Sequence, residues 1–263
     1  MPIKLQKEHV SLSEVLCSQY CRCAAESDVI VPDVKPDVLK ILQISSDVTV
    51  TQKNVQTDRV YVQGVIRLNI LYIPDGETVG RVKSISATQD FSHQLDIKGA
   101  KAGMVLSVDA ECEPPEYTLI NSRKLNVRSK IGLSIKLTVP TEVEIATDID
   151  GDEPVQTSGM HLRLCSAGSE AERDIIIRER LEIPDGKPDI GELLKIDAKP
   201  FSSELKIIDG KAAVKGEVRL CLLYGAADED ASVQFAEYTL PFTEILEIDG
   251  LAEGMEGEVE YSV

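Results

Sequence analysis

Residues 60–72 read Val60-Tyr61-Val62-Gln63-Gly64-Val65-Ile66-Arg67-Leu68-Asn69-Ile70-Leu71-Tyr72. The even-numbered residues of this stretch are apolar, aromatic or glycine, and polar residues such as Gln63 and Arg67 stand between them. A period of two places successive side chains on opposite faces of a strand, so the stretch predicts a strand with one buried face. A longer alternation from Leu125 to Val139 predicts another. Short strands and few helical periods favour an all-β fold, either a β-sandwich or an open barrel.

The same stretch occurs twice in the chain. Gly64-Val65-Ile66-Arg67-Leu68 returns as Gly216-Glu217-Val218-Arg219-Leu220, an offset of 152 residues. At the same offset, Val31-Pro32-Asp33-Val34-Lys35-Pro36-Asp37-Val38 returns as Ile183-Pro184-Asp185-Gly186-Lys187-Pro188-Asp189-Ile190. After one deletion the offset is 151, and it aligns Phe91, Gly103 and Met104 with Phe242, Gly254 and Met255. We therefore expect a tandem of two copies of one module.

The repeat divides the chain into four predicted segments. They are an N-terminal leader (1–30), a first module (31–145), an acidic linker (146–159) and a second module (160–263) that is incomplete at its C-terminus. In the leader, Ser11 and Glu14 have the spacing of a capping box, which predicts a short helix over Leu12–Arg22. The expected architecture is thus all-β, with two homologous β-sandwich or open-barrel modules and a short helical leader.

The repeat also predicts the two cores. We expect them to be lined by Val62, Ile66, Leu68, Ile70 and Tyr72 and by Val214, Val218, Leu220, Leu222 and Tyr224. Asp209-Gly210 predicts a hairpin turn, and the alternation over Ile175–Leu181 predicts a further strand. The second module has no counterpart of the long strand from Leu125 to Val139, since Val263 aligns with Cys112. We expect another segment, in cis or in trans, to complete its sheet.

The repeated proline–aspartate motif has two readings. Its residues are Pro32, Asp33, Lys35, Pro36 and Asp37, and in the second copy Pro184, Asp185, Lys187, Pro188 and Asp189. Proline fixes φ and favours an extended residue before it, while aspartate accepts backbone N–H bonds, so the motif predicts a rigid entry into a strand or helix. A binding role is the alternative.

The leader carries a cluster of three cysteines, Cys17, Cys21 and Cys23. They are free thiols on an amphipathic segment, or they form intermolecular crosslinks after assembly, or they bind zinc with a fourth ligand such as His9. The spacing matches no standard zinc pattern. The other cysteines (Cys112, Cys165 and Cys221) are scattered and are expected to be small buried hydrophobic residues.

Composition excludes several functions. The formal net charge is −17, which argues against nucleic acid and anionic membranes as partners. No run approaches the roughly 20 apolar residues of a membrane span, and no signal-peptide pattern is present, so we expect a cytoplasmic protein. Tryptophan is absent. The three histidines lie in unrelated contexts, and there is no P-loop, zinc-protease or nucleophile-elbow motif. We expect no enzyme activity, cofactor or metal.

Several repeated blocks resemble a known family. The Pro-Asp-x-Lys-Pro-Asp run, Ile70-Leu71-Tyr72, Gly103-Met104 and the block Asn121-Ser122-Arg123-Lys124-Leu125 are similar to the SPOCS domain of SipL-type spore coat morphogenesis proteins of clostridial spore formers. The resemblance covers nearly all of 31–139 and most of 175–263. It differs in two respects. Such proteins usually carry a C-terminal LysM module, which this sequence lacks, and the second module has no block that matches Asn121-Ser122-Arg123-Lys124. The resemblance is therefore to a fragment or a form without LysM.

The resemblance implies a non-catalytic structural role. It implies a mother-cell protein that assembles on the spore coat and recruits or scaffolds coat proteins at the forespore surface. The implied partners are other spore coat morphogenetic proteins, among them the basal coat ATPase SpoIVA, with self-association as a further possibility. SpoIVA is the partner that the missing LysM module puts in question. The alternatives are a glycan-binding β-sandwich for cortex or coat polysaccharide and an enzyme with an unfamiliar site.

Overall fold

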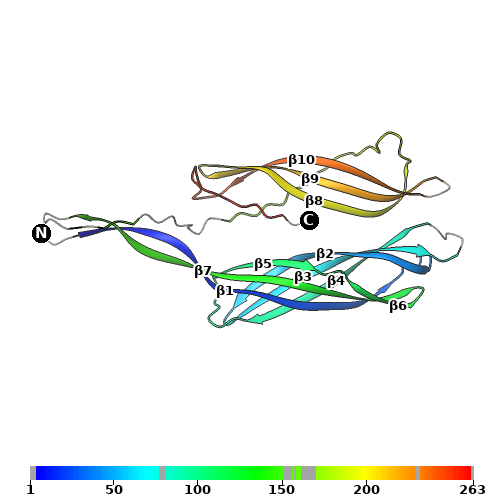
Figure 1. Cartoon of the computed structure of the whole chain (residues 1–263), viewed down its shortest axis with the longest axis horizontal. Coiled ribbons are helices and arrows are strands. Elements are labelled where there is room, and N and C mark those ends of the chain that lie inside the picture. Colours follow the sequence, from blue (N-terminus) through cyan, green and yellow to red (C-terminus); the bar gives the residue numbers. More distant parts are fainter. Residues whose placement is uncertain are drawn as a thin grey trace.

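The computed structural model describes residues 4–76, 81–150, 156, 158–160, 170–228 and 232–261. In this part of the chain every regular element is a strand, and the strands form three antiparallel sheets (Figure 1). They are β1 (Lys4–Ile30), β2 (Val38–Gln56), β3 (Arg59–Pro74), β4 (Lys83–Asp96), β5 (Val105–Cys112), β6 (Glu116–Asn121), β7 (Lys124–Asp150), β8 (Ile190–Ile208), β9 (Lys211–Ala226) and β10 (Val233–Glu247). The all-β prediction is confirmed. Among these residues there is no helix that could cross a membrane.

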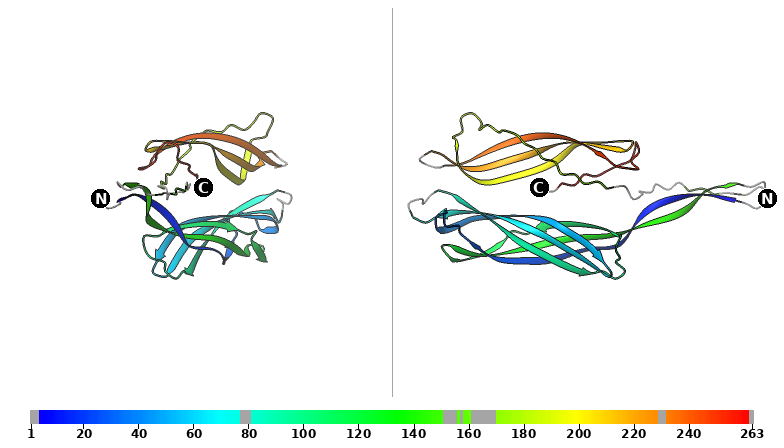
Figure 2. Two further views of the ribbon diagram at one scale, coloured as in Figure 1. Left: turned by 60° about the vertical axis from the view of Figure 1, so that its left-hand side comes forward. Right: turned by 180° about the vertical axis from the view of Figure 1, so that it is seen from behind.

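Two of the sheets pack face to face as a β-sandwich in the first module (Figure 2). One sheet has the order β2-β3-β4, and the other has the order β1-β7-β5 with β6 also paired to β7. Alternate residues of β3 and β7 fill the space between them, as the period of two predicts. The fully buried ones are Val60, Val62, Ile66, Ile70 and Tyr72 from β3 and Leu125, Val127, Ile131, Leu133, Ile135 and Leu137 from β7.

The predicted helix over Leu12–Arg22 is wrong, because this segment lies in the middle of strand β1. β1 runs antiparallel to β7 along its whole length. Cys17 and Cys21 are four residues apart, a spacing that places them on one face of a helix and equally on one face of a strand. Cys21 and Cys23 are two apart and share a face only in a strand. Pairing with β7 therefore overrides the local capping signal.

β1 and β7 also change the predicted segment boundaries. Their paired ends, residues 4–13 and 140–150, continue beyond the sandwich as a two-stranded ribbon (Figure 1). The leader 1–30 is thus not separate from the first module, since β1 belongs to its second sheet. Residues 146–150, predicted to begin the linker, are the last residues of β7.

The third sheet, β8-β9-β10, repeats the β2-β3-β4 sheet of the first module. The strand order is the same, and the pair Val38–Pro74 returns 152 residues later as Ile190–Ala226. Three register shifts recur at this offset as well: those after Val38, Ile41 and Val50 return after Ile190, Leu193 and Ser202. The predicted hairpin at Asp209-Gly210 is confirmed, with Gly210 at φ 72°. Its counterpart, Asp58, also has positive φ, at 56°.

The second layer of the sandwich is not repeated in the second module. Residues 170–182 and 256–261 align with parts of β1 and β5, and both lie across the inner face of the third sheet without strand pairing. Tyr238 Oη of β10 donates to the carbonyl of Glu182 at 2.9 Å, and Gly257 lies against Leu205 of β8. The predicted strand over Ile175–Leu181 is wrong. This segment has no counterpart of β7 to pair with among the described residues.

The second core is consequently less buried than the first. Val214 and Tyr224 are buried, as predicted, but Val218, Leu220 and Leu222 are only half-buried. Their counterparts in β3 are all buried. The third sheet thus has an inner face that the described residues cover incompletely.

Glu192, near the start of β8, joins the two modules. Its carboxylate is ion-paired with Lys35 of the first module and accepts a bond of 2.5 Å from Lys83 Nζ at the start of β4. Next to it, Asn69 donates to the carbonyl of Leu194 at 3.0 Å, and Leu194 is buried. Burial opposes ionisation of Glu192, but the bonds and charges of Lys35 and Lys83 outweigh it and lower its pKa.

We expect Glu192→Gln to destabilise the chain by about 1–2 kcal/mol at neutral pH, because two half-buried lysines lose a charged acceptor. Because the pKa of Glu192 is lower in the folded state, the ionised carboxylate stabilises the fold fully above the unfolded pKa, near 4.3. This stabilisation disappears as the pH falls through the folded pKa. Urea denaturation of wild type and variant should therefore differ at pH 7, and the difference should shrink as the pH falls below the unfolded pKa and disappear below the folded one. Glu204→Gln is the control, since the exposed Glu204–Lys215 pair should contribute almost nothing. A difference that does not shrink on acidification would contradict the role of this charge.

Candidate functional site

The proline–aspartate motif forms a rigid loop before β2. Lys35 N donates to Pro32 O at 2.9 Å, which closes a turn across the first half of the motif. Tyr72 Oη of β3 donates to Pro36 O at 3.1 Å, and burial raises the pKa of Tyr72 to about 12. Asp75 N donates to Asp37 O at 2.8 Å. The loop is therefore held against the end of β3.

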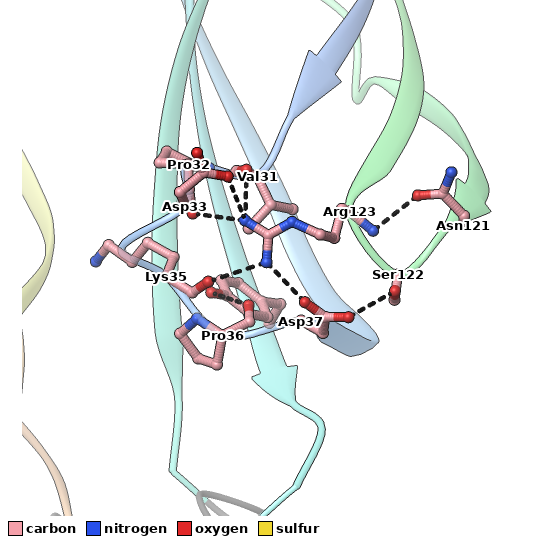
Figure 3. Close-up of polar contacts among 10 residues, drawn as sticks. Val31, Pro32, Asp33, Lys35, Pro36, Asp37, Asn121, Ser122 and Arg123 are labelled. Atoms are coloured by element: carbon pink, nitrogen blue, oxygen red, sulfur yellow. Dashed lines mark hydrogen bonds and ion pairs between the residues drawn. The ribbon is translucent and has the colours of Figure 1, made fainter.

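The loop surrounds one side chain, Arg123, from the turn between β6 and β7 (Figure 3). Arg123 Nη1 donates to Asp37 Oδ1 at 2.7 Å and to Lys35 O at 3.4 Å. Nη2 donates to the carbonyls of Val31 at 3.1 Å and Pro32 at 3.0 Å, and to Asp33 Oδ1 at 3.3 Å. A planar guanidinium presents several donors in fixed directions, so it can join the carbonyls and carboxylates of one loop at once.

Two further bonds fix the same junction. Ser122 Oγ donates to Asp37 Oδ2 at 2.8 Å, and Val38 N donates to Ser122 O at 2.8 Å. The hydrogen bonds from Arg123 and Ser122 lower the pKa of Asp37. Asp37 thus binds the side chains of Arg123 and Ser122, and β2 begins at the next residue, so the motif is a rigid entry into a strand. In the first module the motif attaches the beginning of β7 to the loop before β2.

The second copy of the motif has the same backbone but lacks the arginine. Lys187 N donates to Pro184 O at 3.1 Å, Tyr224 Oη to Pro188 O at 3.2 Å, and Ala227 N to Asp189 O at 2.9 Å. Each of these bonds repeats one of the first copy. In the described part of the chain, however, no cation reaches the carboxylate of Asp185 or Asp189. The second loop thus repeats the backbone of the first, and its two carboxylates are without a cation among the described residues.

The leader cysteines lie on the inner face of β1. Cys17, Cys21 and Cys23 are half-buried against the first core, together with Cys112 of β5. Cys23 and Cys112 are both paired with Ile131 of β7, from opposite sides, so one strand separates them. Burial raises the pKa of the Cys21, Cys23 and Cys112 thiols. A protonated, half-buried thiol reacts slowly, so intermolecular crosslinking stays a prediction that requires β1 to open.

We expect the triple variant Cys17→Ser, Cys21→Ser, Cys23→Ser and the wild type to give the same monomer band after mild oxidation of the folded protein. In urea strong enough to unfold the sandwich and expose β1, only the wild type should add disulfide-linked dimers through these residues, because exposed thiols recover ordinary pKa values. Non-reducing gels make the comparison. Dimers of folded wild type that the variant lacks would show that the thiols are accessible in the native strand.

A metal centre finds no support in the described residues, which contain no group of three or more His, Cys, Asp or Glu side chains able to hold an ion. His9, the candidate fourth ligand, lies on the ribbon with its Nε2 at 3.8 Å from Glu144 Oε1. Cys221 is half-buried on β9 and donates to Glu237 at 3.5 Å. His161 and Cys165 lie outside the described residues.

Arg123 and Glu192 are the residues whose roles the sequence did not reveal. Arg123 stood inside a recognised block, but nothing in the sequence paired it with a loop about ninety residues away. The available signal for this role was the position of Arg123, just before the long alternation of apolar and polar residues from Leu125 to Val139. Glu192 departs from the repeat, since its counterpart is Lys40. A charge reversal between two copies was the signal for a contact that only one copy makes.

Comparison with known protein families gives a match. The family model described as SipL, SPOCS domain, matches residues 37–120 and 189–263. Both matches begin at the second aspartate of the motif, Asp37 in the first copy and Asp189 in the second. Curated proteins and solved structures give no match. The two matched ranges cover more than half of the sequence and include all three strands of each repeated sheet, so the chain belongs to the SipL family and carries its SPOCS domain twice.

Proposed function

We propose that this chain is a non-catalytic protein-interaction module in spore coat assembly, which recruits or scaffolds coat proteins at the forespore surface. Family membership indicates a role in sporulation. The observation that supports an interaction role is the duplication itself, because two copies of one β-module present similar surfaces twice in one chain.

A non-catalytic role is consistent with the lining of two shallow hollows among the described residues. One, of about 360 Å³, is lined by residues 53–55 and 102–106 with Glu170. The other, of about 340 Å³, is lined by Thr51, residues 63–65 and residues 90–92. Neither contains a histidine or a cysteine, and active sites usually combine a nucleophile with a base of shifted pKa.

The glycan-binding alternative has no supporting observation in the described residues. Sugar rings stack on free aromatic faces, but cations already lie over several exposed rings. Lys187 Nζ is 4.0 Å from the centroid of Phe235, Arg219 Cζ is 5.5 Å from that of Phe201, and Arg22 Cζ is 5.7 Å from that of Tyr20. We therefore propose a protein partner.

A fluorescent fusion of the full chain tests the proposal in sporulating cells. It should form a shell around the forespore, and deletion of the gene should leave coat proteins dispersed in the mother cell. A uniform fusion signal together with a normal coat would contradict the proposed function. Retention of the purified protein on cortex or coat polysaccharide, with no protein partner crosslinked to it in cells, would favour glycan binding.

A further inference from the structure

We propose that the second module binds the first module of another copy of this chain, through the same kind of contact that joins the two modules within the chain. One of the two surfaces is the start of β2, and the other is the outer face of β9 and β10. The inference goes beyond the proposed function, because it links copies of the chain to one another rather than to a coat protein.

Within the chain, the start of β8 packs on the outer face of the first module's β2-β3-β4 sheet (Figure 1). Leu194, the extra residue at a register shift in β8, is 1% exposed. Leu71 faces outward from β3, yet it is only 6% exposed and does not belong to the first core. Asn69 of β3 donates to the carbonyl of Leu194 at 3.0 Å, and Ser84 Oγ of β4 donates to that of Leu193 at 3.5 Å.

This contact is heterologous, because two modules with the same strand order meet through different surfaces. The second module uses the start of its first sheet strand, and the first module uses the outer face of its sheet. A heterologous contact between similar units can be repeated from one unit to the next, since each unit carries both surfaces. In this chain the contact leaves two surfaces unused, namely the start of β2 and the outer face of β9 and β10.

The start of β2 has the same shape as the start of β8. Leu42 is the counterpart of Leu194 and is likewise the extra residue at a register shift, but it is 47% exposed. Leu39, at the preceding register shift, is 52% exposed. The first module thus presents in solution the leucine that the second module buries.

The outer face of β9 and β10 presents apolar side chains where the first module receives Leu194. Phe235 is paired with Leu223, as Ser84 is paired with Leu71 in the first module. Phe235 is 59% exposed, and Leu223 is half-buried. Exposed aromatic residues are enriched in the buried centres of protein interfaces, so this position suits an incoming leucine.

The charge on the two unused surfaces is reversed relative to the contact within the chain. Within the chain the acid is on the strand, because Glu192 of β8 is ion-paired with Lys35 and Lys83 of the first module. At the start of β2 the strand carries a base instead, since Lys40 is the counterpart of Glu192. A partner surface for β2 therefore needs an acid.

The outer face of the third sheet supplies that acid. Asp197 and Glu237 are both paired with Cys221 of β9, from its two sides, where the first module has serines. Asp197 is ion-paired with Lys195 at 2.8 Å, whereas Glu237 is exposed and accepts a bond from the Cys221 thiol at 3.5 Å. Glu237 is thus the carboxylate that a basic strand would meet.

The same charges exclude the alternative pairing. Lys40 on the outer face of a first module would meet Lys35 and Lys83, and like charges at an interface oppose association. On the third sheet the counterpart of Lys35 is Lys187, whose Nζ lies 4.0 Å from the centroid of Phe235 and bonds the carbonyl of that residue. Charge therefore favours the second module as the partner of β2.

Two blocked variants of the 263-residue chain test the proposal. Leu42→Asp removes the first surface and Phe235→Asp the second, and both side chains are exposed, so the variants should fold. In light scattering the mass of the wild type should grow beyond a dimer as concentration rises to about 1 mM, which covers weak specific contacts. Each variant alone should remain monomeric. An equimolar mixture should form a dimer and nothing larger, because each variant supplies the surface that the other lacks.

A charge exchange tests the proposed pair of residues. Lys40→Glu and Glu237→Lys should each weaken association about tenfold, and a chain with both changes should recover it, since the pair is restored with opposite polarity. Lys53→Glu, the same change at an exposed position further along β2, is the control and should leave association unchanged. These substitutions also carry the test if an apolar variant fails to fold.

Three results would overturn the proposal: a wild type that remains monomeric at about 1 mM, one that stops at a dimer, and a mixture of the blocked variants that does not associate. Failure of the doubly exchanged chain to recover association would overturn the pairing of Lys40 with Glu237. A fusion that surrounds the forespore while the purified chain remains monomeric contradicts only this inference.

Discussion

Leu68→Ala is expected to destabilise the first module by about 2–5 kcal/mol, because it removes a buried leucine from a packed core. Leu68 is 2% exposed and lies between the two sheets of the sandwich. Its counterpart in the third sheet, Leu220, is half-buried under an incompletely covered face. Leu220→Ala should therefore cost roughly 1 kcal/mol, as expected when part of the side chain already contacts water.

Hydrogen exchange distinguishes the two modules, because β3 and β9 give separate peptides. Because the two modules can unfold separately, a single unfolding midpoint would not show which module the substitution has destabilised. Equal losses of stability for Leu68→Ala and Leu220→Ala would mean that the inner faces of both sheets are equally covered in solution.

Arg123→Ala is expected to release the loop before β2 and the beginning of β7 together. The variant removes five hydrogen bonds to this loop, among them the bond to Asp37. Amide exchange in residues 31–38 and 121–128 should become about tenfold faster or more, because the carbonyls lose their shared donor. Arg123→Lys should recover little of the protection, since an ammonium cannot reproduce the planar fork.

The pH dependence of this junction has a defined sign. The pKa of Asp37 is lowered by Arg123 and Ser122. The ionised carboxylate of Asp37 therefore stabilises the folded state fully above the unfolded pKa, near 3.9. This stabilisation disappears as the pH falls through the lower folded pKa. The protection of residues 31–38 from exchange should differ between wild type and Asp37→Asn at pH 6 and become equal at low pH.

Arg128→Ala is the control for Arg123→Ala, because Arg128 lies in β7 but outside the loop. Fast exchange of residues 31–38 in that variant too would contradict a specific role for Arg123.

The sequence by itself determined the parts of the protein that depend on local period and on duplication. The alternation of residues 60–72 predicted β3 and its buried face, and the repeat predicted β9. The dipeptide Asp209-Gly210 predicted a hairpin. These features need only neighbouring residues, because side-chain direction in a strand has a period of two and a turn depends on a few dihedral angles.

Tertiary structure decided the state of residues 4–30 and 170–182. The first segment has a capping box that predicts a helix, yet it is a strand because β7 offers a continuous partner. The second alternates like a strand, yet it is not one in the described chain, where it has no such partner. A strand satisfies its backbone groups only through another strand, so local sequence could not determine either outcome. The role of Arg123 depends on the same pairing, which brings the start of β7 to a loop far away in the sequence.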